Sequence, residues 1–277
     1  MNLSFLKWLG GKSKLVDQIK SLMPKNKHKR FIEPFAGSLV VSMNVNAEKH
    51  IVNDFNKDLI FLYRHVRDNY KSLLKELEKI FVKQNNTQEK YIAFRKEFNS
   101  IKKNNIRRSA LFVYLNRHGF NGLCRYNSNG EFNVGFGKYK TVNLPAEMLA
   151  NTNRVLNESN FQFYSKDFRH FLKMAKEGDV VYCDPPYAPF DELRGNLNFT
   201  GYVPSSFDLK EQLELAQLAA KAAKRGALVI ISNHSTWFTR QLYGTYGAKI
   251  KFLNVKRSVS CKGDNRQPAP ELFAIFN

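Results

Sequence analysis

The sequence predicts an α/β fold with a layered, largely parallel sheet. Short β-rich runs recur along the 277 residues with helical stretches between them, an alternation that is typical of parallel sheets. Hydrophobic residues at 43% and charged residues at 25% are near the averages of soluble globular proteins, which excludes a disordered or fibrous protein. Because a domain usually has roughly 100 to 200 residues, we expect one core that carries a large insertion.

The β-rich runs give the strands of the expected sheet. They occupy residues 30–32, 50–53, 161–164, 179–183, 227–232 and 249–255. A turn-rich stretch at 262–270 precedes a last run at 271–276. We expect this last strand to close the sheet and to run antiparallel to its neighbour.

The alternation breaks in the middle of the chain, where helical periodicity takes over. Apolar residues spaced three and four apart predict helices at 59–81, 89–101 and 107–115. The sequence therefore divides into a discontinuous core and a helical insert: the core is residues 1–56 and 145–277, and the insert is residues 57–144.

The second half of the insert has a different composition, in which glycine, asparagine, aromatic and cationic residues are interleaved. Asn129-Gly130 stands between Tyr126 and Phe132, and an Asn-Gly pair flanked in this way is a hairpin-turn signal. We expect a β-hairpin at 118–140.

The charge balance indicates a polyanionic partner. Lys and Arg number 44 against 24 Asp and Glu, for a net charge of +20. The basic residues are spread along the chain and do not gather on one amphipathic helix, which favours nucleic acid over a membrane surface. The longest apolar stretches, such as 227–231, are far shorter than the ~20 residues of a membrane span. With no signal peptide at the N-terminus, we expect the cytoplasm of a bacterial or phage-infected cell.

The cysteines and histidines do not form a metal site in the sequence. Cys124, Cys183 and Cys261 are far apart and have no Cys-x-x-Cys spacing, which excludes a disulfide framework and a zinc site. His118 and His234 have no partner at metal-ligand spacing, so structural roles are expected for both and no metal is required.

The strongest local signal is Asp184-Pro185-Pro186-Tyr187 at the end of the expected strand 179–183. Ligands of open α/β sheets bind beyond the carboxyl ends of the strands. The two prolines remove backbone donors and leave carbonyl acceptors in a stiff turn. The Asp184 carboxylate and the Pro185 carbonyl can both accept from an amino group, while Tyr187 offers a ring on which a flipped base can stack. The alternative interpretation is a rigid turn with a buried tyrosine.

Further motifs accompany this turn in one order along the chain, and together they give the sequence a family resemblance. They are FLKWLGGK at 5–12, EPFAG at 33–37, Asn53-Asp54, LNR at 115–117, NGLCRYN at 121–127, GEFNV at 130–134 and ISNH at 231–234. In these motifs and in Asp-Pro-Pro-Tyr the chain resembles the Dam-type, D12 class family of DNA adenine-N6 methyltransferases. The resemblance implies a Rossmann-like sheet that binds S-adenosylmethionine.

The resemblance also implies which residues hold S-adenosylmethionine: Trp8, Gly10, Lys12, Glu33, Phe35, Gly37, Asp54 and Asp184. Trp8 would offer an aromatic face, Lys12 a cation for the carboxylate, and Asp54 a ribose acceptor. A core tryptophan, an exposed lysine and a solvated aspartate are the alternatives. The family often has a second glycine where this chain has Leu39. A P-loop is excluded, because that pattern needs a glycine at position 6, which is Leu6.

For DNA, the resemblance implies contacts from Arg117, Phe120, Asn121, Leu123, Arg125, Asn127, Lys138 and Lys140. Arg125 would pair with guanine O6 and N7, and Leu123 would touch a thymine methyl group. Phe120 and Asn121 would wedge into the base stack, and the two lysines would contact phosphates. The alternative is a basic, solvated loop. The chain departs from the family pattern at Phe120, often tyrosine, and at Gly135, often proline.

The expected function is transfer of a methyl group from S-adenosylmethionine to N6 of a flipped adenine in double-stranded DNA, within GATC by resemblance. No metal, covalent intermediate or obligate protein partner is required. Carbon-5 cytosine chemistry is excluded because Cys183 precedes the turn and does not occupy it. Methylation of cytosine N4 or of RNA adenine, and a non-catalytic DNA-binding relative, remain as alternatives.

Overall fold

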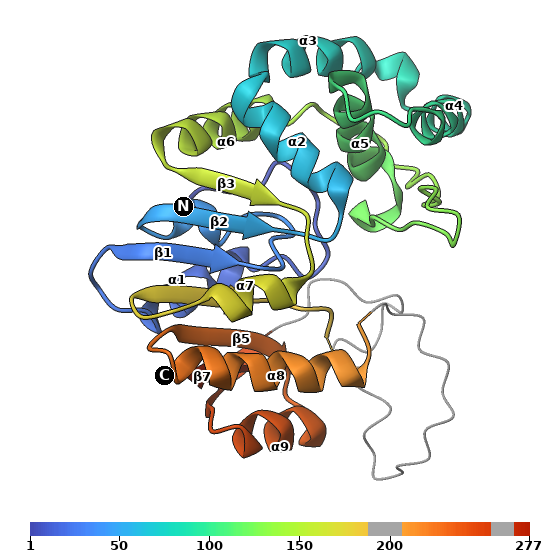
Figure 1. Cartoon of the computed structure of the whole chain (residues 1–277). Coiled ribbons are helices and arrows are strands. Elements are labelled where there is room, and N and C mark those ends of the chain that lie inside the picture. The colour runs from blue at the N-terminus through green and yellow to red at the C-terminus, as the bar shows by residue number, and fades with distance from the viewer. Residues whose placement is uncertain (188–206, 256–268) are drawn as a thin grey trace. The chain divides into compact units, whose positions relative to one another are not determined.

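The computed structural model describes residues 1–187, 207–255 and 269–277, and the chain divides into two compact units. The first unit is Met1–Ser21 with Ala36–Lys166, and the second is Leu22–Phe35 with Asp167–Asn277. Figure 1 gives their elements. The expected insert, 57–144, lies inside the first unit. Cys261 and most of the turn-rich stretch, through residue 268, fall outside the described residues.

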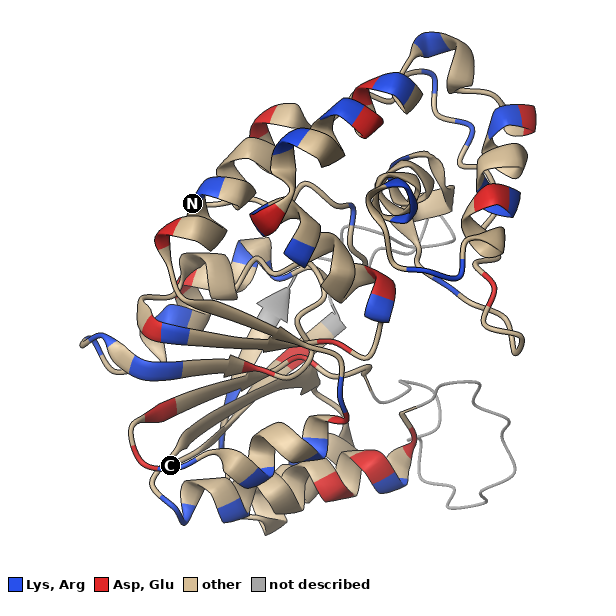
Figure 2. Cartoon of the chain, turned by 45° about the horizontal axis from the view of Figure 1, so that its top comes forward, with Lys and Arg blue, Asp and Glu red and all other residues tan. Residues whose placement is uncertain are grey.

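The surface carries its basic residues on many elements. Figure 2 shows Lys and Arg distributed over the helices and connecting segments, interspersed with fewer Asp and Glu. In the part of the chain that the structure describes, no helix has the length and apolar character that crossing a membrane requires.

The second unit contains five strands among its described residues. β1 (His28–Glu33), β4 (Asp179–Cys183) and β5 (Leu228–His234) pair in parallel, with Phe31 opposite Val180 and Val181 opposite Val229. β7 (Ala269–Phe276) runs antiparallel to both β5 and β6 (Lys249–Val255). The last strand is antiparallel as expected. It does not close the sheet, however: it pairs on both sides and leaves β6 outside it, a placement that the order of strands in the sequence does not specify.

The helices of the second unit begin at capping residues. α7 (Phe168–Met174), α8 (Leu209–Ala223) and α9 (Trp237–Thr245) follow Asp167, Asp208 and Thr236, whose side chains accept hydrogen bonds from the first-turn backbone. α8 packs against β5, α7 and α9. The strand β4 is buried along its whole length, as the apolar run at 180–183 predicts for a parallel strand, and its first residue, Asp179, pairs with Arg30.

The first unit has one strand pair and several helices. β2 (Ala47–Asn53) and β3 (Phe161–Tyr164) are parallel, with His50 opposite Phe161 and Asn53 opposite Tyr164. Its shorter helices near the N-terminus are η1 (Ser13–Leu15), α1 (Val16–Ser21) and η2 (Ser42–Asn44). Parallel pairing therefore prevails in both units, and the predicted α/β class with a mostly parallel sheet is confirmed.

The helical stretch of the first unit is longer than the three expected helices. It contains α2 (Lys57–Asp68), α3 (Tyr70–Ile80), η3 (Lys83–Asn85), α4 (Gln88–Ser100), α5 (Ile106–His118) and α6 (Ala146–Glu158). The single helix expected at 59–81 is wrong: Asn69 has φ −131° and ψ 30°, which ends α2 and lets α3 start in a new direction. The apolar spacing continues across the break, because both helices face one core.

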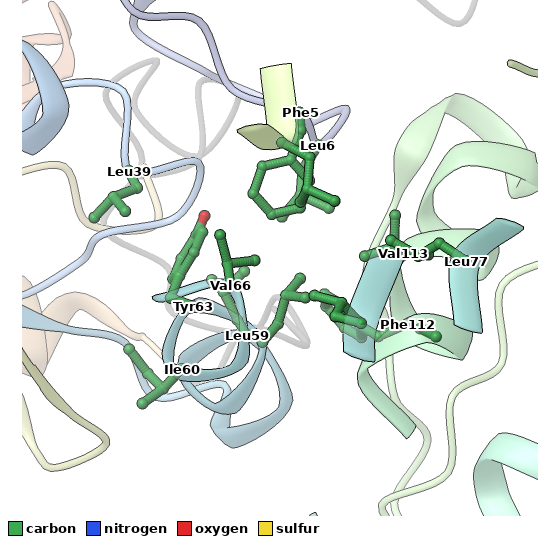
Figure 3. Close-up of a cluster of buried hydrophobic side chains, with 14 of the residues drawn as sticks. Phe5, Leu6, Leu39, Leu59, Ile60, Tyr63, Val66, Leu77, Phe112 and Val113 are labelled. Carbon is green, nitrogen blue, oxygen red and sulfur yellow. The ribbon is translucent and has the colours of Figure 1, made fainter. Parts of the chain in front are cut away.

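That core lies among α2, α3 and α5 (Figure 3). Leu59, Tyr63 and Val66 of α2 are completely buried, as are Phe112 and Val113 of α5. Fully burying such a side chain contributes about 1.5 to 3 kcal/mol. The ends of these helices, which carry the polar residues described below, are thus fixed on a rigid framework.

The stretch at 118–140 folds back on itself as the antiparallel hairpin that the sequence predicts, but its pairing is interrupted. It begins with η4 (Phe120–Gly122), and its strand-like pairing is limited to two isolated antiparallel bridges, Gly119 with Phe136 and Tyr126 with Phe132. The turn is where Asn129-Gly130 predicts it, since the Gly130 amide donates to the carbonyl of Asn127 at 2.9 Å. Backbone bonds also join the two sides of the segment, such as the bond from the Asn133 amide to the Arg125 carbonyl at 3.0 Å.

Candidate active site

The Asp-Pro-Pro-Tyr turn follows directly on β4. This strand lies between β1 and β5 and is parallel to both, so Asp184 stands at the carboxyl end of an interior strand. Ligands of parallel sheets bind beyond this end. The turn therefore occupies the position that the sequence predicts for it.

The Asp184 carboxylate is held by a buried serine. The hydroxyl of Ser232, on β5, donates to Asp184 Oδ1 at 2.8 Å, and Ser232 is completely buried. The hydroxyls of Ser232 and Tyr182 are 3.1 Å apart, which lets Tyr182 donate to the serine oxygen in turn. A carboxylate fixed by a charge-assisted hydrogen bond is pre-oriented for a ligand.

A buried polar network fixes the second half of the turn. Gln212 Nε2, on α8, donates to the Pro186 carbonyl at 2.8 Å, and Gln212 Oε1 accepts from Asn233 Nδ2 at 3.1 Å. Asn233 also donates to the Tyr243 hydroxyl at 2.9 Å. Within residues 1–187, 207–255 and 269–277, the Pro185 carbonyl accepts no hydrogen bond.

Tyr187 contacts two residues of neighbouring strands. Its hydroxyl donates to Glu271 Oε2 at 3.2 Å, and its ring packs edge-on against His234, with 4.7 Å between centroids. Burial raises the pKa of the Tyr187 hydroxyl, and the nearby carboxylates of Asp184 and Glu271 raise it further. Tyr187 is therefore a neutral, positioned ring at physiological pH.

Both lone histidines make structural contacts. His234 supports Tyr187, while His118, in the first unit, stacks on Tyr114 with 3.8 Å between centroids. Among the residues with described coordinates, no three His, Cys, Asp or Glu side chains are grouped as a metal would need.

In the first unit, Gly37 lies against the ring of Trp8. A Cβ atom on Gly37 would come within 2.5 Å of Trp8 Nε1, and the backbone has φ +48°. The Gly37 amide donates to Asp54 Oδ2 at 2.9 Å, and its carbonyl accepts from Tyr63 at 2.6 Å. Only glycine fits here, because both the backbone angle and the contact with Trp8 exclude a side chain.

Lys12 belongs to the same sequence motif as Trp8, FLKWLGGK at 5–12. It is buried, and its Nζ donates to the carbonyl of Gly10 at 2.7 Å. Gly10 has φ +76°, a conformation that glycine adopts without strain. The turn at 8–12 is closed by a bond from the Gly11 amide to the Trp8 carbonyl at 3.2 Å. A buried cation is thus fixed beside Gly10.

Asp54 follows β2 and organises this loop. Besides Gly37, its carboxylate accepts from the Asn56 amide at 2.9 Å. Burial raises the pKa of Asp54, while the bonds from Asn56 and Gly37 oppose that shift. Its neighbour Phe55 is 82% exposed. Sequence reasoning missed Phe55, although an aromatic residue directly after the acidic residue of a ligand loop was a visible signal.

Leu39 replaces the second glycine of the loop and keeps a glycine-like backbone. Its φ is +64°, and its side chain is completely buried. A left-handed conformation costs a non-glycine residue about 1 kcal/mol, which burial of the leucine side chain offsets. The departure from the family pattern therefore leaves the local backbone conformation accessible.

Three of the expected cofactor residues, Glu33, Phe35 and Asp184, belong to the second unit. Glu33 is the last residue of β1 and is 2% exposed. Phe35 packs against Phe168 and Phe207, with 5.4 and 5.5 Å between ring centroids. Glu33 is thus a buried carboxylate at the carboxyl end of its strand, and Phe35 stands two residues beyond it.

The expected DNA contacts from 117 to 140 differ in exposure. The exposed ones are Phe120, Asn121, Arg125, Lys138 and Lys140. Phe120, half exposed, stands next to Asn121, whose φ is +53° and whose amide donates to the Tyr139 hydroxyl at 2.9 Å. These five side chains are accessible to a duplex.

Two other residues expected to contact DNA, Leu123 and Asn127, contact other residues of the protein. Leu123 is half-buried and packs against the core of the first unit. The Asn127 side chain accepts from the amides of Asn129 and Glu131 at 3.0 and 2.9 Å, so it holds the turn together. The structure thus gives Asn127 a role in loop shape.

A pair of cations adjoins this segment. The Lys7 ammonium donates to the Arg117 carbonyl at 3.0 Å and lies 3.7 Å from the centre of the Tyr139 ring. Burial lowers the pKa of both side chains, and in Lys7 the nearby Arg117 adds to the effect. Arg117 Nε is buried without a hydrogen-bond partner among the described residues. Sequence reasoning missed Lys7, because only the fold brings it to residue 117. Two adjacent cations can accept an anion.

The amino-acid sequence matches one protein family and several known proteins. The family described as D12 class N6 adenine-specific DNA methyltransferase matches residues 8–259. The DNA adenine methylase of Escherichia coli K12 is 41% identical over 276 residues, covering 99% of this chain and 95% of that protein. The DNA adenine methylase of Haemophilus influenzae is 43% identical over 274 residues, covering 98% and 93%. The DNA N-6-adenine-methyltransferase of Escherichia phage P1 is 41% identical, covering 99% of this chain and 35% of that protein.

These matches confirm the resemblance that the motifs carry, and with it an enzyme. The chain belongs to the D12 class of N6 adenine-specific DNA methyltransferases.

Proposed function

We propose that this enzyme transfers a methyl group from S-adenosylmethionine to N6 of an adenine flipped out of double-stranded DNA, within the sequence GATC. The observation that carries the proposal is the Asp184 carboxylate, held by Ser232 at the carboxyl end of β4. The curated relatives from E. coli and H. influenzae are named DNA adenine methylases, which supports the same base and the same polymer.

Asp184 and Pro185 hold the reacting amine. Two acceptors on an exocyclic amino group orient the nitrogen lone pair away from them and stabilise the positive charge that develops on nitrogen. Tyr187 stacks on the flipped base, and flipping itself is required because N6 cannot be reached inside the duplex. Nitrogen loses its proton after it gains the methyl group, so the rate depends on positioning and electrostatics.

The described residues fit S-adenosylmethionine by the chemistry of their groups. When bound, it supplies a methyl group made electrophilic by its sulfonium. Lys12 offers a cation to the carboxylate, Asp54 an acceptor to ribose hydroxyls, and the exposed Phe55 a face to adenine. The further proposed contacts are Trp8, Gly10, Glu33, Phe35, Gly37 and Asp184.

Double-stranded DNA is proposed to bind the exposed residues of the 117–140 segment. Arg125 reads a guanine through its fork of donors, and Phe120 with Asn121 fills the gap left by the flipped base. Lys138, Lys140 and the Lys7 and Arg117 pair hold phosphates without reading sequence. Leu123 remains proposed for a thymine methyl group, and Asn127 for phosphate.

Transfer of labelled methyl from S-adenosylmethionine to two short duplexes tests the proposal. One duplex contains GATC, and the other has the same composition with its adenines moved out of that context. The expected result is N6-methyladenine in the first duplex alone. Label in both duplexes contradicts the GATC assignment, and label in neither with folded protein contradicts the donor or the substrate. A duplex made only of G·C pairs and an RNA with the sequence of the GATC duplex serve as controls.

A further inference from the structure

Backbone hydrogen bonds join the two sides of the loop that carries Arg125, but among the described residues they do not attach it to helices α2 and α4. Its two isolated bridges leave most of residues 119–137 without a ladder, yet a side chain that pairs with both guanine acceptors must be placed to within roughly 0.5 Å. Arg125 itself is oriented locally, because its Nε donates to Asn133 Oδ1 at 2.9 Å and its carbonyl accepts from the Asn133 amide at 3.0 Å. Contacts with the helices of the first unit must therefore fix the positions of Arg125 and Asn133.

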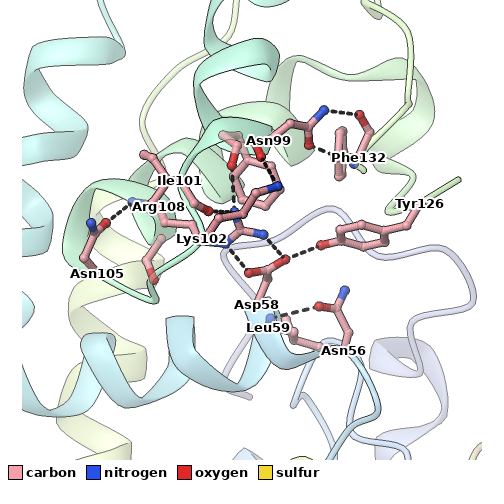
Figure 4. Close-up of polar contacts among 12 residues, drawn as sticks. Asn56, Asp58, Leu59, Asn99, Ile101, Lys102, Asn105, Arg108, Tyr126 and Phe132 are labelled. Carbon is pink, nitrogen blue, oxygen red and sulfur yellow. Dashed lines mark hydrogen bonds and ion pairs between the residues drawn. The ribbon is translucent and has the colours of Figure 1, made fainter. Parts of the chain in front are cut away.

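Tyr126, the neighbour of Arg125, is bonded to helix α2. Its hydroxyl donates to Asp58 Oδ2 at 2.8 Å, and its ring meets Phe132 edge-on with 5.7 Å between centroids (Figure 4). Asp58 lies in the first turn of α2, only 11% exposed. One side of the loop is therefore tied to α2 through a single hydroxyl group.

Phe132, the neighbour of Asn133, is bonded to helix α4. The side chain of Asn99 accepts from the Phe132 amide at 2.9 Å and donates to its carbonyl at 3.1 Å. The Phe132 ring is buried against Phe98, with 5.8 Å between centroids. The other side of the loop is therefore tied to α4.

Arg108 of α5 joins the two helices that make these contacts. Its Nε and Nη2 donate to the two Asp58 oxygens at 2.6 and 2.9 Å. Its Nη1 donates to the carbonyls of Phe98, at 2.6 Å, and Ile101, at the end of α4. The guanidinium lies 4.0 Å from the centre of the Phe98 ring. One side chain thus sets the distance between the residues that hold Tyr126 and Phe132.

A buried ion pair of this kind is weak evidence for stability, since its desolvation cost is comparable to its attraction. Its stronger effect is on geometry, because the planar guanidinium of Arg108 makes four hydrogen bonds to four acceptors in fixed directions. We propose that Asp58, Asn99 and Arg108 are positioning residues for base discrimination, which act on Arg125 through Tyr126 and Phe132. This inference rests on the proposed reading of guanine by Arg125.

Tyr126→Phe removes only the hydroxyl that reaches Asp58. The measurement is the ratio of kcat/KM on a GATC duplex to kcat/KM on a duplex with one outer G·C pair replaced. We expect Tyr126→Phe to lower this ratio about five- to tenfold, the effect of one hydrogen bond, with circular dichroism unchanged. Arg108→Lys keeps the positive charge but loses the paired guanidinium donors to Asp58, and it should lower the ratio at least as much. Tyr114→Phe is the matched control: its hydroxyl bonds to the Asn85 carbonyl, away from the loop, and the ratio should not change.

The double variant Arg125→Ala with Tyr126→Phe separates positioning from general weakening. If Tyr126 acts through Arg125, adding Tyr126→Phe to Arg125→Ala lowers the ratio no further. A ratio that is unchanged in both Tyr126→Phe and Arg108→Lys, while Arg125→Ala lowers it, would overturn the positioning role and leave the proposed readout standing. Losses that multiply in the double variant would overturn it too. A ratio unchanged in Arg125→Ala would instead contradict the readout itself.

Discussion

Ser232 donates a hydrogen bond of 2.8 Å to Oδ1 of Asp184, although 48 residues separate the two in the sequence. The parallel pairing of β4 with β5 brings them together, since Cys183 lies opposite Ile231 and each precedes one of the pair. The sheet register thus places a buried donor beside the carboxylate that we propose to hold the target amine.

Ser232→Ala should lower kcat about tenfold or more, because a hydrogen bond to a charged group contributes about 1.5 to 3 kcal/mol. The KM for DNA should stay within about twofold, since the serine is not one of the residues proposed to bind the duplex. Steady-state and single-turnover methyl transfer measure both values. Ser109→Ala, which removes another buried hydroxyl, one that contacts His65, is the control. A rise in KM at constant kcat would refute the role of Ser232 in orienting Asp184.

Asp184→Ala should reduce methyl transfer by roughly 100-fold or more, as the loss of an electrostatic acceptor does. Binding of a GATC duplex should remain near the wild-type level, because the basic segment is untouched. Fluorescence anisotropy of a labelled duplex, together with transfer of labelled methyl, separates the two effects. Lost binding in a folded variant would show that Asp184 also holds the complex together.

Arg125→Ala should relax the preference at one base pair, at a cost of about 1 to 3 kcal/mol of discrimination. Binding to a set of duplexes that differ from GATC at one position measures it. Lys140→Ala serves as the comparison, since loss of a phosphate contact weakens all duplexes alike and reduces the salt dependence. Equal weakening on every duplex would identify Arg125 as another phosphate contact.

The sequence predicts the strands 161–164, 179–183 and 249–255 with their observed bounds, because short apolar runs between turns have few alternatives. It does not predict the insertion of β7 between β5 and β6, since strand order depends on contacts between distant segments. The break at Asn69 is missed for a related reason: α2 and α3 face one core, so the apolar spacing continues through it.

In the candidate site, too, the sequence predicts some residues and misses others. The proposed roles of Asp184, Gly37 and Arg125 come from short sequence motifs. Ser232 also stands in a motif, ISNH at 231–234, but the motif does not show its bond to Asp184, while Gln212 and Arg108 are ordinary in their own segments. Their function arises only where the fold brings them into contact, so no local pattern could reveal them. The expected hairpin is present with interrupted pairing, and bonds from Phe132 to Asn99 and from Tyr126 to Asp58 attach it to α4 and α2.

Gly37→Ala should disrupt the proposed cofactor loop. The new Cβ would lie 2.5 Å from Trp8 Nε1 at a backbone φ of +48°. We expect a loss of roughly 2 to 4 kcal/mol in unfolding free energy, from backbone strain plus overpacking. The affinity for S-adenosylhomocysteine, measured by calorimetry, should fall about tenfold or more.

Two other glycines supply the controls for Gly37→Ala. Gly130 has φ +74° with no atom within 4 Å of a new Cβ, so Gly130→Ala should show the backbone cost alone, about 1 kcal/mol. Gly135 has neither feature, and Gly135→Ala should leave both stability and ligand binding unchanged. If Gly37→Ala behaves like Gly130→Ala, the contact with Trp8 is not restrictive.

His118 should make the stability of the enzyme depend on pH. Burial lowers the pKa of its imidazole from 6.5 to about 4, with Lys7 and Arg117 adding to the shift. The unfolded chain therefore takes up a proton as the pH falls below 6.5, while the folded ring stays neutral until about pH 4. Stability is thus fully present above pH 6.5 and is lost as the pH falls toward 4, by roughly 2 kcal/mol between pH 6.5 and 4.5.

Urea unfolding of the wild type and of His118→Asn at pH 6.5 and 4.5 isolates this contribution, because the carboxylates titrate alike in both proteins. The variant should be less stable at both values, since it loses the stacking of the ring on Tyr114. It should nevertheless lose less stability than the wild type between them. An equal loss in the two proteins would mean that the buried ring takes up its proton in the folded state, and that water or an anion reaches His118 beside Lys7 and Arg117.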